Sequence, residues 1–96
     1  MKINYNLVKR SSLEDFANKH KLELDVNERT DPALPKYYVA FKSSEVKDGS
    51  MLISSSGDGN TIDEAIDEYK KKVSNKVLVI NAMKENRREI RVPKLT

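Results

Sequence analysis

The first quarter of the chain switches between two hydrophobic periods. Residues 3–7 and residues 22–26 alternate apolar and polar side chains, which is typical of half-buried β-strands. Between these stretches, residues 12–20 carry apolar side chains at helical spacing, and Ser11 or Ser12 can supply the N-cap hydroxyl. The pattern therefore predicts a strand, a short helix and a second strand.

The middle of the chain predicts a β-hairpin. Two prolines interrupt residues 30–35, so this stretch is expected to be a loop. Residues 37–41 are rich in strand-forming side chains on both faces, which indicates a central strand. The Asp48-Gly49 dipeptide is a turn signal, and we expect the strand at 37–41 to pair across it with a strand at 51–55.

The strongest periodic signal lies at residues 61–73, where it predicts an amphipathic helix. Thr61 and Glu64 form a capping box at its start. Acidic residues fill the first turn and the lysines at 70–72 stand in the last, which is the arrangement that the helix dipole favours. The predicted buried face is a single apolar stripe of Ile62, Ala65, Ile66, Tyr69 and Val73.

The C-terminal part predicts two more strands. Residues 77–80 are a continuous apolar run suited to a buried strand, and residues 88–93 alternate until Pro93 stops them, which indicates an edge strand. The element order β-α-β-β-β-α-β-β indicates a single α+β domain over residues 1–96. We expect its two helices to pack on one face of a mostly antiparallel sheet and to leave the other face open.

Composition favours a small folded domain. A chain of 96 residues can build one core, and 38% apolar residues in patterned runs are enough for folding despite 34% charged residues. Cysteine is absent, which excludes disulfides and thiolate metal sites. The N-terminus lacks the apolar core of a secretion signal and no stretch is long enough to span a bilayer, so we expect a cytoplasmic protein.

The sequence offers little catalytic chemistry. His20 is the sole histidine and ends the first predicted helix, so we interpret it as a helix-end residue rather than a catalytic base. One histidine without cysteine cannot form a catalytic zinc site. Gly57-x-Gly59 precedes a helix as phosphate-binding loops do, but Asp58 and Glu64 would repel a phosphate, which favours a plain strand-to-helix turn. We therefore expect no enzyme activity, no cofactor and no metal site.

Positive charge is concentrated near the C-terminus. Residues 76–96 hold six of the 18 lysines and arginines and two of the 15 acidic residues, which gives a net charge of +4 there and −1 elsewhere. A basic hairpin can lie along a nucleic-acid backbone, whereas charges on an edge strand can also serve to prevent sheet-to-sheet aggregation. Both interpretations concern one candidate site, formed by Lys84, Arg87, Arg88, Arg91 and Lys94.

Two resemblances to known proteins add to this interpretation. Residues 22–82, with Gly-Asn-Thr-Ile-Asp-Glu-Ala-Ile at 59–66, resemble the HicB-type antitoxin domain. That resemblance implies a degraded ribonuclease-H-like fold that grips a partner toxin. The whole chain, especially at residues 57–61, 78–80 and 86–93, is also similar to small accessory proteins of bacteriophage and prophage genomes. This second resemblance implies a phage or prophage origin and an auxiliary role in a bacterial host cell, such as binding a host protein or nucleic acid.

The sequence leaves three functional hypotheses. The leading one is a non-enzymatic binding module of phage or prophage origin that binds a host protein and acts as an inhibitor of a host factor. The alternative is a nucleic-acid-binding protein that uses the basic C-terminal hairpin. The third is self-association, through the edge strand at 88–93 or through the open face of the sheet.

Overall fold

The computed structural model describes residues 2–3 and 12–95, which form eight strands and two helices. In chain order these are β1 (Lys2–Ile3), α1 (Ser12–His20), β2 (Leu24–Glu28), β3 (Tyr37–Phe41), β4 (Ser44–Asp48), β5 (Met51–Ile53), β6 (Gly57–Gly59), α2 (Ile62–Val73), β7 (Val77–Ile80) and β8 (Arg88–Arg91). The candidate N-cap Ser11 and most of the first predicted strand lie outside the described residues.

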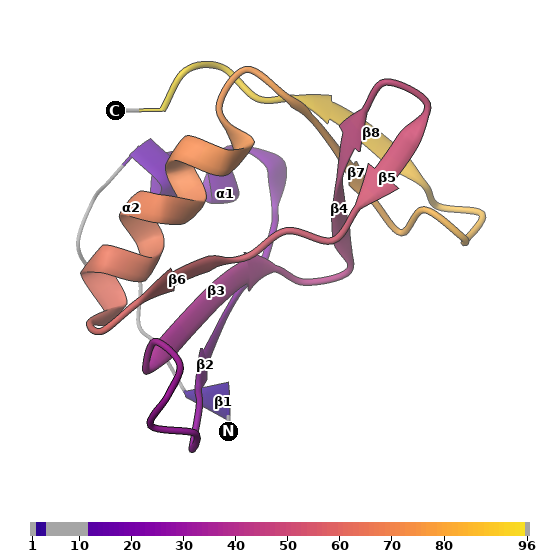
Figure 1. Cartoon of the computed structure of the whole chain (residues 1–96). Helices are drawn as coiled ribbons and strands as arrows, with labels where there is room; N and C mark the ends of the chain where they lie inside the picture. Colours follow the sequence, from indigo (N-terminus) through magenta and orange to yellow (C-terminus); the bar gives the residue numbers. More distant parts are fainter. Residues whose placement is uncertain (1, 4–11, 96) are drawn as a thin grey trace.

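The strands form two four-stranded sheets, and neighbouring strands in both are antiparallel (Figure 1). Sheet A has the order β1-β2-β3-β6, and sheet B has the order β5-β4-β7-β8. The predicted α+β class and its antiparallel strands are confirmed. The strands divide into two sheets because β3 leads through a bend into β4, a strand that the sequence pattern did not predict.

The bend between the two sheets lies at Ser43. This residue has a positive φ of 56°, which turns the chain out of sheet A directly after Phe41. The hydroxyl of Ser44 donates to the Phe41 carbonyl oxygen at 2.6 Å and closes the bend. The predicted pairing of residues 37–41 with 51–55 is therefore wrong, since β3 pairs with β2 and β6 whereas β5 pairs with β4.

Helix α2 packs on β6 and β3, and its Tyr69 bonds to the strand end beside the bend at Ser43. The hydroxyl oxygen of Thr61 accepts the N–H of Glu64 at 3.1 Å, so the predicted N-cap is confirmed. The fully buried Tyr69 accepts the N–H of Phe41 at 3.1 Å through its hydroxyl oxygen. The predicted stripe is buried at Ala65, Ile66, Tyr69 and Val73 and partly buried at Ile62.

Both helices lie on one face of sheet A. The ring of Phe41 contacts Phe16 of α1 with centroids 6.2 Å apart and Tyr69 of α2 with centroids 5.5 Å apart, so the two helices share the face to which Phe41 points. Strand residues that alternate with it, such as Tyr38 and Ala40, lie on the opposite face. Neither described helix is long and apolar enough to cross a bilayer.

Candidate partner-binding site

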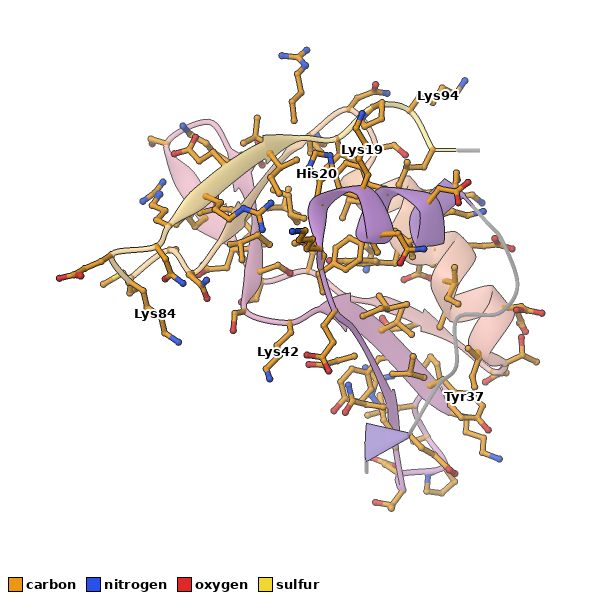
Figure 2. All side chains as sticks on the ribbon, turned by 180° about the vertical axis from the view of Figure 1, so that it is seen from behind. Lys19, His20, Tyr37, Lys42, Lys84 and Lys94 are labelled. Carbon is orange, nitrogen blue, oxygen red and sulfur yellow. The ribbon has the colours of Figure 1, made fainter. Side chains whose placement is uncertain are left out.

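The five predicted basic residues lie along β8 and at both of its ends. Lys84 belongs to the turn before the strand and Lys94 follows it, and Figure 2 shows these two side chains well apart, Lys84 at the left and Lys94 at the upper right. All five side chains are exposed, as the sequence predicts for a charged edge. The structure therefore does not gather them into one patch, and each of the three arginines has a different environment.

The side chain of Arg88 binds the C-terminal end of α1. Its Nη2 donates to the carbonyl oxygen of His20 at 2.9 Å. Helix α1 ends with a hydrogen bond from the N–H of Leu22 to the carbonyl oxygen of Ala17 and with Lys21 at a positive φ of 55°. The carbonyl oxygen of His20 takes no part in this closing hydrogen bond. Arg88 thus satisfies a helix-end carbonyl that the backbone leaves open.

His20 itself lies beside this contact. Its ring packs on Phe16 with centroids 4.5 Å apart. Burial lowers the pKa of His20, and the positive charges of Lys19 and Arg88 lower it further. The environment therefore favours neutral imidazole, which matches a packing residue at a helix end.

Arg87, directly before β8, forms an ion pair with Glu89 of that strand. Its Nη2 lies 3.0 Å from Oε2 of Glu89, and Lys47 Nζ lies 3.4 Å from Oε1 of the same carboxylate. The hydrogen bond from Arg87 and the charge of Lys47 lower the pKa of Glu89. Arg91 is exposed on the same face and forms no ion pair with any residue that the structure describes.

The two glycines before α2 have a structural role. They form strand β6 rather than the predicted turn. A Cβ on Gly57 would meet the carbonyl oxygen of Ala65 and lie 2.5 Å from the nitrogen of Tyr69, and a Cβ on Gly59 would lie 2.5 Å from the nitrogen of Ala65. Their glycine character lets β6 approach the helix, and no phosphate needs to be invoked.

The face of sheet A opposite the helices is hollowed where it meets sheet B. A groove of about 550 Å³ lies there, and we call it the inter-sheet groove. It is lined by the outer face of β2 and β3, by residues 42–45 at the bend, by the serines at 54–56, and by residues 81–84. Figure 2 labels Lys42 and Lys84, which both line it.

The chemistry of the inter-sheet groove is polar and of mixed charge. Amide and hydroxyl groups come from Asn27, Asn81 and the serines, and the lysines are balanced by carboxylates such as Glu45. Met83 also lines the groove and is 94% exposed, the highest value among the large apolar side chains with described burial. Sequence reasoning missed this site, although three consecutive serines and an apolar residue in a charged turn were visible signals.

Among residues 2–3 and 12–95, no three acidic or histidine side chains gather closely enough to hold a metal ion. The fold and the groove define an α+β protein with two antiparallel sheets and a concave surface where they meet. No protein-family model, curated protein or solved structure matches the chain. The resemblances to HicB-type and phage accessory proteins stay predictions.

Proposed function

We propose that the protein is a non-enzymatic binding module that holds a segment of a protein partner in its inter-sheet groove. The observation that carries the proposal is the pairing of this concave polar surface with Met83, whose side chain is almost fully exposed at the groove. A flexible thioether adapts to varied apolar partners, and methionine is common at binding surfaces for that reason.

The groove suits a polypeptide better than a polyanion. Its hydroxyl and amide groups can donate to and accept from the backbone of an extended segment. Lys42 and Lys84 are accompanied by the acidic Glu45, so the groove does not present the single positive sign that attracts phosphates. A protein segment with its own mixture of polar groups and one apolar anchor fits this lining.

The placement of the basic residues weakens the nucleic-acid alternative. Arg88 is held by the end of α1 and Arg87 by Glu89, so two of the five predicted phosphate contacts already have partners. Lys84 and Lys94 do not lie side by side but stand apart on the molecule (Figure 2). The resemblance to HicB-type antitoxins, which implies that a partner protein is gripped, also favours a protein partner, and we take this partner to be a host protein that the module would inhibit.

The test is capture of bacterial proteins by the immobilised chain, with Met83→Asp as the groove variant and Leu34→Asp as the matched control. Leu34 is also an exposed apolar residue, at 51%, but it does not line the groove. We expect a captured protein to survive nuclease treatment and the control substitution and to bind at least tenfold more weakly to the groove variant. Binding titration with the purified partner measures that ratio.

The following outcomes would contradict the proposal. If nuclease removes the captured material, or if DNA and RNA bind the chain at low salt with a steep salt dependence, the nucleic-acid alternative is correct. If Met83→Asp and Leu34→Asp behave alike toward every captured protein, the groove is not the binding surface.

A further inference from the structure

The outermost strand of sheet B, β5, is an uncovered apolar edge. Met51 is 65% exposed and Ile53 is 41% exposed, and they point to the same face of the strand because they are two residues apart. Residues 49–57 form the longest stretch without a charge in a chain with 34% charged residues. Exposed apolar edge strands are pairing sites unless something protects them, and β5 carries neither charge nor proline.

The hairpin register leaves a donor and an acceptor on this edge. Asp48 faces Met51 across a two-residue turn, and Gly49 at its first position has a φ of 61°, as a type II′ turn requires. The pair that closes such a turn is hydrogen bonded, so the next pair, Lys47 and Leu52, is not. The N–H and C=O of Leu52 therefore point away from β4.

The sequence around Leu52 is complementary to itself. Residues 50–54 read Ser-Met-Leu-Ile-Ser, so an antiparallel copy centred on Leu52 places serine against serine and leucine against leucine. In the same register Met51 of each copy lies opposite Ile53 of the other copy, so this apolar pair occurs twice, both times on the same face. Charge is also compatible, because no charged side chain of residues 47–57 faces a charged one in this register.

We propose that a second copy of this chain pairs with β5, so that two sheets B join edge to edge across a twofold axis at Leu52. The other edge of sheet B explains why assembly stops at two. Strand β8 carries Arg88, Glu89 and Arg91 and is followed by Pro93, which are the features that keep edge strands from pairing. Sheet B of each copy then has one usable edge, at β5, and the contact through this sheet is closed.

The dimer is weak. Only three strand residues and their flanking serines take part in each copy, and this is a smaller surface than the roughly 800 Å² per partner of a standard interface. We expect the dimer fraction to rise with protein concentration across the micromolar range. The interface shares Ser54 with the lining of the inter-sheet groove but does not include Met83, so substitutions at Met83 and at Met51 and Ile53 separate partner binding from self-pairing.

Sedimentation velocity over a range of concentrations tests the proposal with a charge-swap pair. M51K/I53K and M51E/I53E each place like charges opposite each other twice, so each alone should stay monomeric with at least a tenfold loss of association. When the two variants are mixed, every introduced lysine faces an introduced glutamate, and we expect a one-to-one dimer. Met83→Asp is the control and should dimerise as the unmodified chain does.

Circular dichroism and thermal melting check that all variants fold, and both substituted positions are exposed in the monomer. A chain that stays monomeric at the highest concentration overturns the proposal. A dimer that survives in M51K/I53K alone also overturns it, as does a mixture that fails to associate while both variants are folded. Loss of the dimer in Met83→Asp would assign self-association to the groove instead.

Discussion

Two edge strands of equal length follow one another in the chain, and they differ in whether a helix covers them. β5, at Met51–Ile53, is the edge of sheet B and is uncovered, whereas β6, at Gly57–Gly59, is an edge of sheet A and lies under α2. Three serines separate them in the chain. The difference lies in the side chains, because a helix can approach a strand this closely only where no Cβ intervenes.

Helix α2 also satisfies the backbone of the edge that it covers. The N–H of Asp58 donates to Glu68 Oε1 at 3.2 Å, and Lys72 Nζ donates to the carbonyl oxygen of Ser56 at 2.7 Å. On the outer face, Asp58 pairs with Arg29 at 2.6 Å, and Arg29 lies 4.4 Å from the centroid of the Tyr38 ring. The edge at β6 is thus covered by α2 of the same chain, whereas the edge at β5 is uncovered and can pair with a second copy.

The most direct way to break this comparison is Gly57→Ala. The added methyl would overlap the backbone of α2 at Ala65 and Tyr69, so the helix must move away from sheet A. Overpacking of this kind against backbone should lower the free energy of unfolding by about 3 kcal/mol. Urea denaturation followed by circular dichroism measures the loss.

Gly49→Ala is the matched control for that substitution. Gly49 has no heavy atom within 4 Å of an added Cβ, and its cost comes only from its positive φ of 61°. We expect a loss of about 1 kcal/mol, as for a non-glycine residue in the left-handed region. Equal losses at the two glycines would show that close approach to α2 is not the reason for glycine at position 57.

Tyr69→Phe should have the next largest effect, because Tyr69 links α2 to the bend between the sheets. The substitution keeps the ring but leaves the N–H of Phe41 without its acceptor and removes the 3.5 Å contact with the hydroxyl of Ser44. Leaving a buried donor unsatisfied costs about 1–2 kcal/mol of unfolding free energy. Phe16→Leu, which changes packing on the same ring cluster without a hydrogen bond, is a suitable comparison.

The pH dependence of the same variant separates the hydroxyl's role from packing. Burial raises the pKa of Tyr69, against the opposing hydrogen bonds with Ser44 and Phe41. Above pH of about 10 the unfolded chain loses this proton before the folded protein does, so the free energy of unfolding falls as pH rises. The advantage of the unmodified protein over Tyr69→Phe should therefore shrink above that pH. A constant difference between pH 7 and pH 11 would contradict the assignment.

Local patterns were enough to predict much of the fold. The helix at 61–73, its cap at Thr61 and its buried stripe follow from periodicity, and the edge position of residues 88–91 follows from alternation before Pro93. The division into two sheets was not predictable, because it depends on Ser43 adopting a positive φ and on Tyr69 reaching the bend. A non-glycine residue with a positive φ carries no clear sequence signal, and the Tyr69 contact joins residues 28 positions apart that no local window connects.

The candidate site shows the same limit. Charge counting located the basic residues, but their roles depend on which way each side chain points from β8 and on what lies beside it. Arg88 meets the end of α1, a helix 68 residues earlier in the chain, and only the tertiary structure reveals that contact. The uncharged stretch at 49–57 was visible in the sequence, although its meaning required knowing that β5 is an edge.

The smallest expected effect concerns β8, the protected edge of sheet B, and compares two arginines on one strand. Arg88→Gln removes the hydrogen bond to the His20 carbonyl oxygen, whereas Arg91→Gln removes a side chain without an ion pair among the described residues. Because the Arg88 contact is exposed, we expect a loss of about 0.5 kcal/mol for Arg88→Gln and no measurable loss for Arg91→Gln. Amide hydrogen exchange should localise the difference to the last turn of α1, since an open helix-end carbonyl promotes fraying. If the two variants lose equal stability, Arg88 does not hold α1, and it would then be as available to a nucleic-acid backbone as Arg91.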